Sequence, residues 1–169
     1  MLCVSSIDPR KNFARLIEAC QGLTGAKLYI VGKYNRVFSQ QMKLDTDSDK
    51  IHFLGRISDE ELVRLYNQAA CFVFPSLYEG FGLPPLEAMA CGCPVLVSDI
   101  PVEREVCGDA ALYFNPLEPN EILCIITQYL SNTDVIKETM RQKGYDNIKR
   151  FSWEKSAKVL MKIIKTDCE

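Results

Sequence analysis

Six short apolar runs, separated by segments of a different character, constrain the fold of this chain more than any other feature. They are rich in β-branched and aromatic residues and read "MLCVSS", "KLYIVG", "IHFLG", "CFVFPS", "PVLVSD" and "ALYFN". Runs this continuously apolar are typical of strands buried on both faces. Because helical patterns lie between them, the strands are expected to be parallel and joined by right-handed crossovers. The sequence therefore predicts an α/β fold with a doubly wound, Rossmann-like parallel sheet.

Two of the intervening segments carry clear helix signals. After the first run, apolar residues recur at the i, i+3, i+4, i+7 spacing and end at a glycine: Phe13, Leu16, Ile17, Cys20 and Gly22. Ahead of the second helix, Ser58 and Glu61 have the spacing of a capping box, in which each side chain accepts a hydrogen bond from a backbone amide of the first turn. The buried stripe expected for that helix is Leu62, Leu65, Tyr66 and Ala69.

From about residue 118 to 166 the strands stop and three helical segments are expected. The last of them carries an apolar stripe: Trp153, Ala157, Leu160, Met161 and Ile164. A helix with such a stripe needs a surface to cover. The simplest expectation is that it packs on its own sheet, and the alternative is that it reaches a domain outside this chain.

Length and charge set further bounds. With 169 residues and 47% apolar content, one domain over residues 1–169 is expected. The net charge of -2 argues against nucleic acid as a partner. Nine Lys or Arg stand against three acidic residues between Lys137 and Lys165. Such a run is most simply a solvated helix face, and peripheral contact with an anionic membrane or with a partner is the alternative.

Cysteine usage and the lack of targeting signals predict a cytoplasmic protein. No apolar stretch is long enough to span a membrane, and no secretory signal is evident. Of the eight cysteines, Cys20, Cys71 and Cys124 stand at apolar positions of the pattern, which fits reduced, packed thiols. The pair Cys91 and Cys93 has one intervening residue and is interpreted as core packing rather than a zinc site.

The stretch "EGFGLPPLE", residues 79–87, follows a predicted strand and leads into a predicted helix. In an open parallel sheet, ligands bind outside the carboxyl ends of the strands. Gly80 and Gly82 allow a ligand to approach the backbone closely, and Pro84 or Pro85 suits the first helical turn. The backbone amides of Phe81, Gly82 and Leu83, together with the helix start, would suit a phosphate.

Two carboxylates flank these glycines. Glu87 is expected in the first turn of the helix, where a carboxylate can accept two hydrogen bonds from a cis-diol such as a ribose. Glu79 precedes the glycines, within reach of a group bound on the other side of the loop. The simpler interpretation is that Glu87 only neutralises the helix dipole and that Glu79 is solvated.

The segment "PSLYEGFGLPPLEAMACGCPVLVSD" resembles the signature of retaining glycosyltransferases with the GT-B fold, the large family 4 group. That signature contains two glutamates separated by seven residues. The blocks "DPRKN", "LYIVG", "IHFLGRISDEELVRLYNQAACFVFPS", "EREVCGDAALYFNP" and "FSW" are also similar to successive blocks of the family. The resemblance implies the C-terminal half of such an enzyme, which holds a nucleotide-sugar donor.

The resemblance also implies roles for individual residues. Glu87 would bind the ribose hydroxyls, and Glu79 would lie at the anomeric side of the donor sugar. The amides of Phe81, Gly82 and Leu83 would contact sugar hydroxyls and phosphate.

Further donor contacts are implied outside the glycine loop, which comprises residues 79–82. Lys11 matches the family's phosphate-binding lysine, although a surface cation is the simpler reading of it. Where the family often has an arginine, this chain has "SSIDPRKN", so Ser6 or Arg10 is expected to compensate in part. The segment Gly55, Arg56 and Ile57 is similar to the part whose backbone edges the base.

The family transfers a sugar from a nucleotide diphosphate sugar to a glycan or lipid-linked glycan acceptor, with no bound metal or other cofactor expected. Lys11 and the loop amides would stabilise the charge that develops on the leaving diphosphate. The acceptor site would lie on an N-terminal domain that no part of this chain resembles, so the chain alone is expected to be inactive. The alternative is a non-catalytic nucleotide-sugar-binding or interaction module with the same fold.

Two other features are expected to have no catalytic role. "DTDSD", residues 45–49, begins like a calcium loop, but Lys50 and Arg56 stand where such a loop needs Gly and Glu. His52 lies on a predicted strand and is interpreted as structural.

Overall fold

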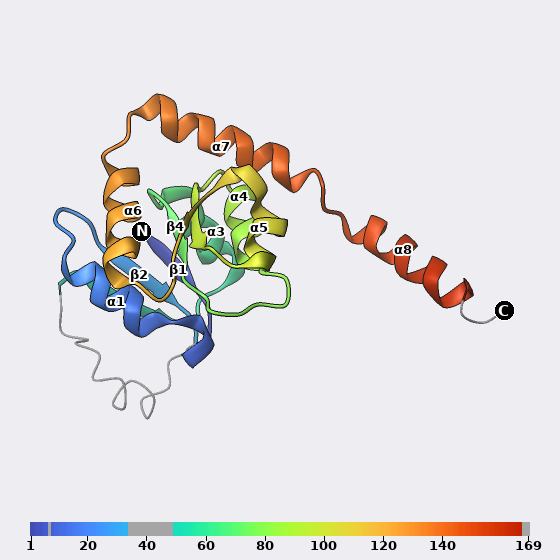
Figure 1. Ribbon diagram of the computed structural model, residues 1–169, viewed down its shortest axis with the longest axis horizontal. Coiled ribbons are helices and arrows are strands. Elements are labelled where there is room, and N and C mark those ends of the chain that lie inside the picture. Colours follow the sequence, from blue (N-terminus) through green and yellow to red (C-terminus); the bar gives the residue numbers. More distant parts are fainter. Residues whose placement is uncertain (7, 34–48, 167–169) are drawn as a thin grey trace.

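A computed structural model describes residues 1–6, 8–33 and 49–166 of the chain. The strands are β1 (Leu2–Val4), β2 (Leu28–Val31), β3 (Ile51–Gly55), β4 (Phe72–Phe74), β5 (Val95–Ser98) and β6 (Ala111–Phe114). The α-helices are α1 (Phe13–Gln21), α3 (Asp59–Gln68), α4 (Leu83–Ala90), α5 (Pro101–Cys107), α6 (Pro119–Leu130), α7 (Asp134–Ile148) and α8 (Trp153–Thr166). Two short 3-10 helices are η1 (Pro9–Lys11) and η2 (Gly108–Ala110). Figure 1 shows their arrangement.

The strands form one parallel sheet in the order β3-β2-β1-β4-β5-β6. This is the strand order of a doubly wound nucleotide-binding fold, whose topological switch point lies between the first and fourth strands. The predicted fold class is therefore confirmed. In such a sheet the crevice between β1 and β4, at their carboxyl ends, is the expected place for a ligand.

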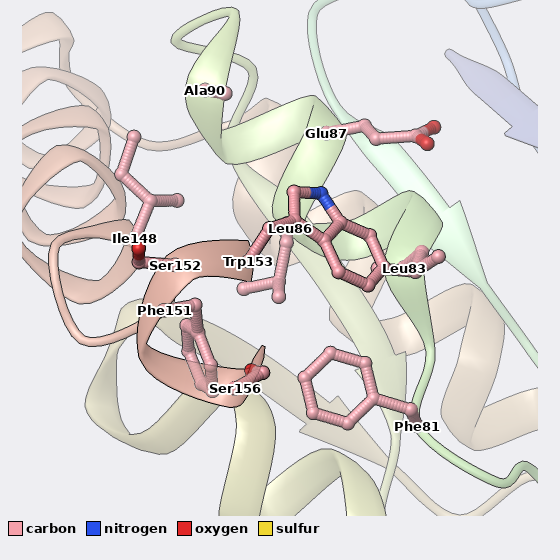
Figure 2. Close-up of a pocket in the computed structure, with 10 residues that line it drawn as sticks. All are labelled: Phe81, Leu83, Leu86, Glu87, Ala90, Ile148, Phe151, Ser152, Trp153 and Ser156. Carbon is pink, nitrogen blue, oxygen red and sulfur yellow. The ribbon is translucent and has the colours of Figure 1, made fainter. Parts of the chain in front are cut away.

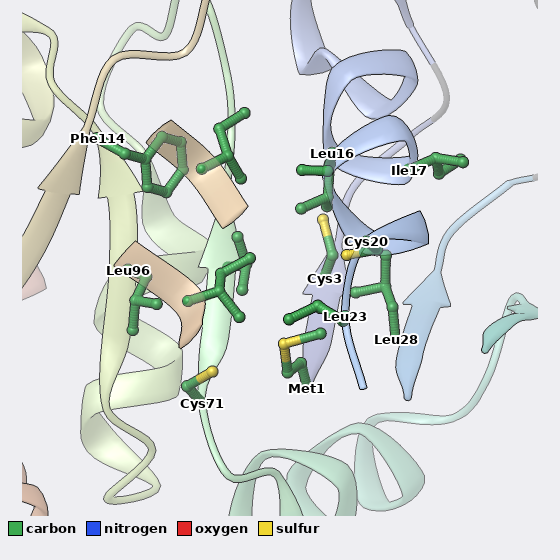
Figure 3. Packing of buried hydrophobic residues seen from close by; sticks show 14 of the residues in the cluster. Met1, Cys3, Leu16, Ile17, Cys20, Leu23, Leu28, Cys71, Leu96 and Phe114 are labelled. Carbon is green, nitrogen blue, oxygen red and sulfur yellow. The ribbon is translucent and has the colours of Figure 1, made fainter. Parts of the chain in front are cut away.

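The sheet is buried on both faces because successive side chains of each strand enter different clusters. Along β4, Val73 joins the cluster under α1 and α6, whereas Phe72 and Phe74 join the cluster under α3, α4 and α5. Figure 3 shows the first cluster, in which Leu16 of α1 meets Cys3 of the sheet. The strand sequences are continuously apolar because helices cover both faces of the sheet.

The predicted helix ends are largely correct. α1 runs from Phe13 and is followed by Gly22, and the capping box of α3 is present: Ser58 Oγ accepts from the Glu61 amide at 3.2 Å and Glu61 Oε2 accepts from the Ser58 amide at 3.1 Å. Cys124 was expected in the core but is exposed. The buried side of α6 is formed by Ile122, Ile126 and Tyr129, and Cys124 faces away from it.

The terminal helix α8 does not pack on the sheet, which contradicts the simpler expectation. Figure 1 shows α8 projecting away from the rest of the protein after the end of α7. Residues 153–165 are all exposed, including Trp153 at 81% and Leu160 at 57%. The apolar stripe is present as the pattern indicates, but no sheet face remains for it, because α1, α6, α3, α4 and α5 already cover both faces.

Within the described part of the chain, no helix combines the length and apolar character needed to cross a membrane. Most basic residues of the C-terminal region are exposed, and several pair with an acidic residue three or four positions away, as Lys149 does with Asp146 and Lys158 with Glu154.

Candidate functional site

Lys11 and Glu79 meet at the switch point of the sheet. Lys11 ends η1, which follows β1, and Glu79 lies in the loop that follows β4. Their Nζ and Oε1 atoms are 2.5 Å apart, although the residues are 68 positions apart in sequence. The two side chains are only 12% and 9% exposed. The lysine and the glutamate expected at a donor site therefore form a largely buried ion pair at the switch point between β1 and β4.

The backbone around this pair is fixed by Asn12, which sequence analysis did not identify. Asn12 is buried, and its backbone has a φ of 56° in the left-handed region. Its side-chain amide donates to the carbonyls of Pro75 at 3.1 Å and Pro116 at 2.6 Å. A single amide thus ties the loop that carries Lys11 to the loops that follow β4 and β6. Asn is tolerant of left-handed backbone, and its position before a helix was the only signal in the sequence.

The glycine loop ends in the geometry expected for a close approach to the backbone. Gly82 precedes the first residue of α4 and has a φ of 82°, which favours glycine. Gly80 does not use this region, and a Cβ there would meet nothing within 4 Å. Phe81 packs edge-on against Phe151, with ring centroids 5.6 Å apart. The loop is therefore anchored to the segment that follows α7.

Glu87 lies beyond the first turn of α4, contrary to expectation. The helix begins at Leu83 and its first turn contains no acidic residue, because Pro84 and Pro85 both fit inside it. Glu87 accepts a hydrogen bond from the Tyr66 hydroxyl at 3.2 Å. Burial, followed by the neighbouring Glu87 charge, raises the pKa of Tyr66. Glu87 itself is exposed, so Tyr66 orients an accessible carboxylate.

A third carboxyl group, Glu103 on α5, reaches the same region and was not identified from the sequence. Glu103 is fully buried, and its Oε1 has no hydrogen-bond partner among the described residues. A Cβ built on Gly82 would lie 2.7 Å from this oxygen. Burial, assisted by the charge of Glu79 and opposed by the Cys107 thiol and Lys11, raises the pKa of Glu103 to about 7.

Arg10, expected to compensate in part for the missing arginine, pairs with Asp8 and not with Glu79. The Arg10 guanidinium Nε lies 3.2 Å from Asp8 Oδ1, and the Arg10 side chain is 52% exposed. What Arg10 contributes is its carbonyl, which accepts from the Leu77 amide at 2.7 Å and joins the two loops. Ser6 is exposed.

The segment expected to edge the base lies at the carboxyl end of β3, the edge strand of the sheet. Gly55 has a φ of 69°, and its carbonyl accepts from the Gly32 amide at 2.8 Å. Arg56 is exposed, and Ile57 is half-buried against the core. This segment shares the carboxyl edge with Lys11 and Glu79 but is two strands from β1.

A cavity of about 570 Å³ lies beside the predicted site, between α4 and the start of α8. Its lining is Phe81, Leu83, Leu86, Glu87, Ala90, Ile148, Phe151, Ser152, Trp153 and Ser156. In Figure 2 the Glu87 carboxylate points away from the side where Ile148 and Phe151 lie. Neither Lys11 nor Glu79 lines it. The cavity therefore shares Phe81, Leu83 and Glu87 with the predicted site but does not include the ion pair.

Outside the switch point, the described part of the chain shows no second centre of this kind. His52 stacks on Tyr29 with ring centroids 5.0 Å apart, and its Nε2 lies 3.1 Å from the Asp49 carbonyl, which fits a structural role. In residues 45–49, all but Asp49 lie outside the described residues. Among the described residues, no three His, Cys, Asp or Glu side chains gather as a metal would require.

The fold and the switch-point crevice place this chain among the Rossmann-like α/β proteins. The family model described as "Glycosyl transferases group 1" matches residues 1–151. The chain belongs to this glycosyltransferase family.

Two curated relatives illustrate the similarity. The chain is 38% identical over 161 residues to O-antigen chain mannosyltransferase B of Escherichia coli, an alignment that covers 90% of this chain and 42% of that protein. It is 54% identical over 119 residues to O-antigen chain mannosyltransferase RfbU of Salmonella typhimurium, covering 68% of this chain and 34% of that protein. The chain thus spans less than half of the length of either relative.

Solved structures agree on the fold. Sucrose-phosphate synthase from Thermosynechococcus elongatus superposes with a TM-score of 0.80 at 26% identity, covering 98% of this chain and 45% of that one. A UDP-forming trehalose-phosphate synthase from Burkholderia xenovorans superposes with a TM-score of 0.75 at 16% identity, covering 88% and 40%. The neighbours are glycosyltransferases of the GT-B fold, in agreement with the predicted architecture.

Proposed function

We propose that this chain is the donor-binding domain of a retaining glycosyltransferase that transfers a sugar from a nucleotide diphosphate sugar to a glycan or lipid-linked glycan. The observation that carries the proposal is the Lys11–Glu79 pair in the crevice between β1 and β4. Membership of the glycosyltransferase family supports it. The relatives named as O-antigen mannosyltransferases favour mannose as the transferred sugar.

In this proposal Lys11 exchanges its partner when the donor binds. The ammonium now held by Glu79 would turn to the diphosphate, where it stabilises the negative charge of the leaving group. The amides of Phe81, Gly82 and Leu83 at the start of α4 would assist it. Glu79, released from Lys11, would lie beside the anomeric carbon and stabilise the positive charge that develops on the sugar.

Glu87 is proposed to hold the ribose. It is exposed and already oriented by the Tyr66 hydroxyl, so its second oxygen and the remaining lone pairs can accept from two hydroxyls of a cis-diol. This arrangement needs neither a metal nor another cofactor. The segment Gly55, Arg56 and Ile57 is proposed to edge the base.

The remainder of the enzyme is proposed to be an N-terminal domain that carries the acceptor site. The curated relatives are more than twice as long as their match to this chain, and the exposed stripe of α8 offers a surface for such a domain. The isolated chain should therefore bind donor weakly and transfer little sugar.

Isothermal titration calorimetry of the chain with UDP, GDP and ADP tests the donor site. One of the three is expected to bind with millimolar or better affinity, and Glu87→Gln should weaken it about 10- to 100-fold, because hydrogen bonds to a charged group contribute about 1.5–3 kcal/mol each. Glu18→Gln, an exposed change on α1, is the matched control and should leave the affinity unchanged. Equal affinities of the Glu87 variant and the wild type would refute the proposed ribose site.

A further inference from the structure

The buried carboxyl of Glu103 is not explained by the fold. α5 is a short helix at the carboxyl edge of the sheet, and its buried apolar residues, Val106 and Cys107, already fill the core beneath it. Burying a carboxyl without satisfying both oxygens destabilises the folded state. One oxygen of Glu103 is weakly satisfied by the Cys107 thiol at 3.5 Å, whereas Oε1 has no partner within the residues described.

The unpartnered oxygen faces the glycine loop. The position of a Cβ on Gly82 falls 2.7 Å from Oε1, so the carboxyl occupies the space that a side chain at this position would need. Gly82 in turn supplies one of the amides proposed to bind phosphate at the start of α4. A change in the charge or place of the Glu103 carboxyl therefore takes place close to the backbone of this loop.

The groups around Glu103 come from several elements. Cys107 lies on its own helix, Glu79 and Lys11 belong to the ion pair at the switch point, and the Tyr113 hydroxyl of β6 donates to the Glu103 carbonyl at 3.3 Å. Of these, Lys11 is the cation and Glu79 the anion. An ionised Glu103 would give this cluster two carboxylates for one ammonium, which favours the protonated acid.

We propose that Glu103 is a positioning residue of the donor site, whose uncharged carboxyl supports the backbone of Gly82 and leaves the charge of Lys11 available to a diphosphate. The inference rests on the proposed function. When Glu103 loses its proton, a negative charge appears beneath the phosphate cradle, and the attraction for the nucleoside diphosphate falls. Binding of the ligand and retention of the proton on Glu103 are therefore coupled.

The direction of the pH dependence follows from this coupling. Below about pH 7 the carboxyl is already protonated, and Glu103→Gln, which has the same shape and no charge, should bind as the wild type does. Above pH 7 the wild type must take up a proton to bind, and its affinity should fall relative to the variant. If ligand binding raises the pKa of Glu103 by about one unit, the ratio of affinities changes about sevenfold between pH 6 and 8.5.

Calorimetric titration of this chain with the nucleoside diphosphate selected above, at pH 6, 7 and 8.5, measures that ratio. The ionisation of the ligand's own phosphate affects both proteins equally and cancels. Glu105→Gln, on the same helix but exposed, is the control and should follow the wild type at every pH. A pH-independent ratio for Glu103→Gln would overturn the inference while leaving the donor site intact. Absence of binding by every variant at every pH would refute the proposed function and, with it, this inference.

A measurement without ligand separates positioning from a purely structural role. In the free wild type, the amide resonances of Phe81 and Gly82 should titrate with a midpoint near pH 7, and in Glu103→Gln they should not. Titration that persists in the variant would assign it to another group and contradict the inference.

Discussion

Two regions of the molecule depart from the usual pattern of apolar side chains inside and charged side chains outside. One is the switch point between β1 and β4, and the other is the terminal helix α8. In the crevice, charged groups are withdrawn from solvent: the side chains of Lys11 and Glu79 are at most 12% exposed, and Glu103 is fully buried. On α8, large apolar side chains are open to water, with Trp153 at 81% and Met161 at 53% exposure.

The two regions affect the stability of the isolated chain differently: the buried charges cost free energy, whereas the apolar side chains of α8 stay in water and contribute little to it. Burying charge costs free energy unless the charges are paired, and the single Lys11–Glu79 bond leaves Glu103 unsatisfied. Exposed apolar surface of this extent marks a site of interaction. The switch point thus fits the charged ligand proposed above, and α8 fits an apolar surface, although both belong to one chain.

A Leu→Ala substitution made in the core and again on α8 should give the largest difference in the free energy of unfolding. Leu16→Ala in α1 removes a side chain with 0% exposure and should lower the free energy of unfolding by about 2–5 kcal/mol, because it leaves a cavity. Leu160→Ala on α8, where the leucine is 57% exposed, should change it by less than about 0.5 kcal/mol. Urea denaturation followed by circular dichroism measures both. A cost above about 1 kcal/mol for Leu160→Ala would show that α8 packs on this domain.

Removing one lysine from each region tests how much its ion pair contributes to stability. Lys11→Met should destabilise the chain by about 1–3 kcal/mol at pH 7, because Glu79 remains without its cation at 9% exposure. Lys158→Met breaks a pair on α8 whose side chains are 74% and 75% exposed, and it should cost at most about 0.5 kcal/mol.

A second substitution supplies the control for the lysine pair. In Lys11→Met/Glu79→Gln the remaining carboxylate is replaced by a neutral side chain of the same shape, so the double variant should be more stable than Lys11→Met alone, as measured by urea denaturation at pH 7. Equal stabilities of the two variants would mean that lost packing, and not the unpaired carboxylate, accounts for the effect.

The sheet and most helices could be predicted because their signals are local. Continuous apolar runs require burial on both faces, and Ser58 with Glu61 fixes the start of α3 through bonds within four residues. The prolines lie in the first turn of α4 as predicted, but Glu87 was misplaced by part of a turn because the helix begins at Leu83, before both of them. Residue types near a helix start therefore predict that a helix is present more reliably than they predict its first residue.

The parts of the site that could not be predicted depend on distant segments. Asn12 acts on Pro116, which is 104 positions away, and nothing near either residue in the sequence indicates that contact. Glu103 is followed in sequence by Arg104 and Glu105, and such a run of charged residues is typical of an exposed helix face. Glu103 is buried because α5 lies close to Gly82, and this contact is not evident from the sequence. For α8 the apolar stripe was recognised, but the pattern does not specify which surface covers it.

Deleting residues 152–169 should have the smallest effect on stability. An unsupported helix of 14 residues is marginal in water, and α8 buries little of its apolar surface on the rest of the chain. The free energy of unfolding of the remaining chain should change by less than about 0.5 kcal/mol, while helical circular dichroism decreases. The truncated chain should also associate less at high concentration in sedimentation experiments, because the exposed apolar stripe is gone. A loss above about 1 kcal/mol would place α8 in the core of this domain, and its stripe would then no longer argue for a partner.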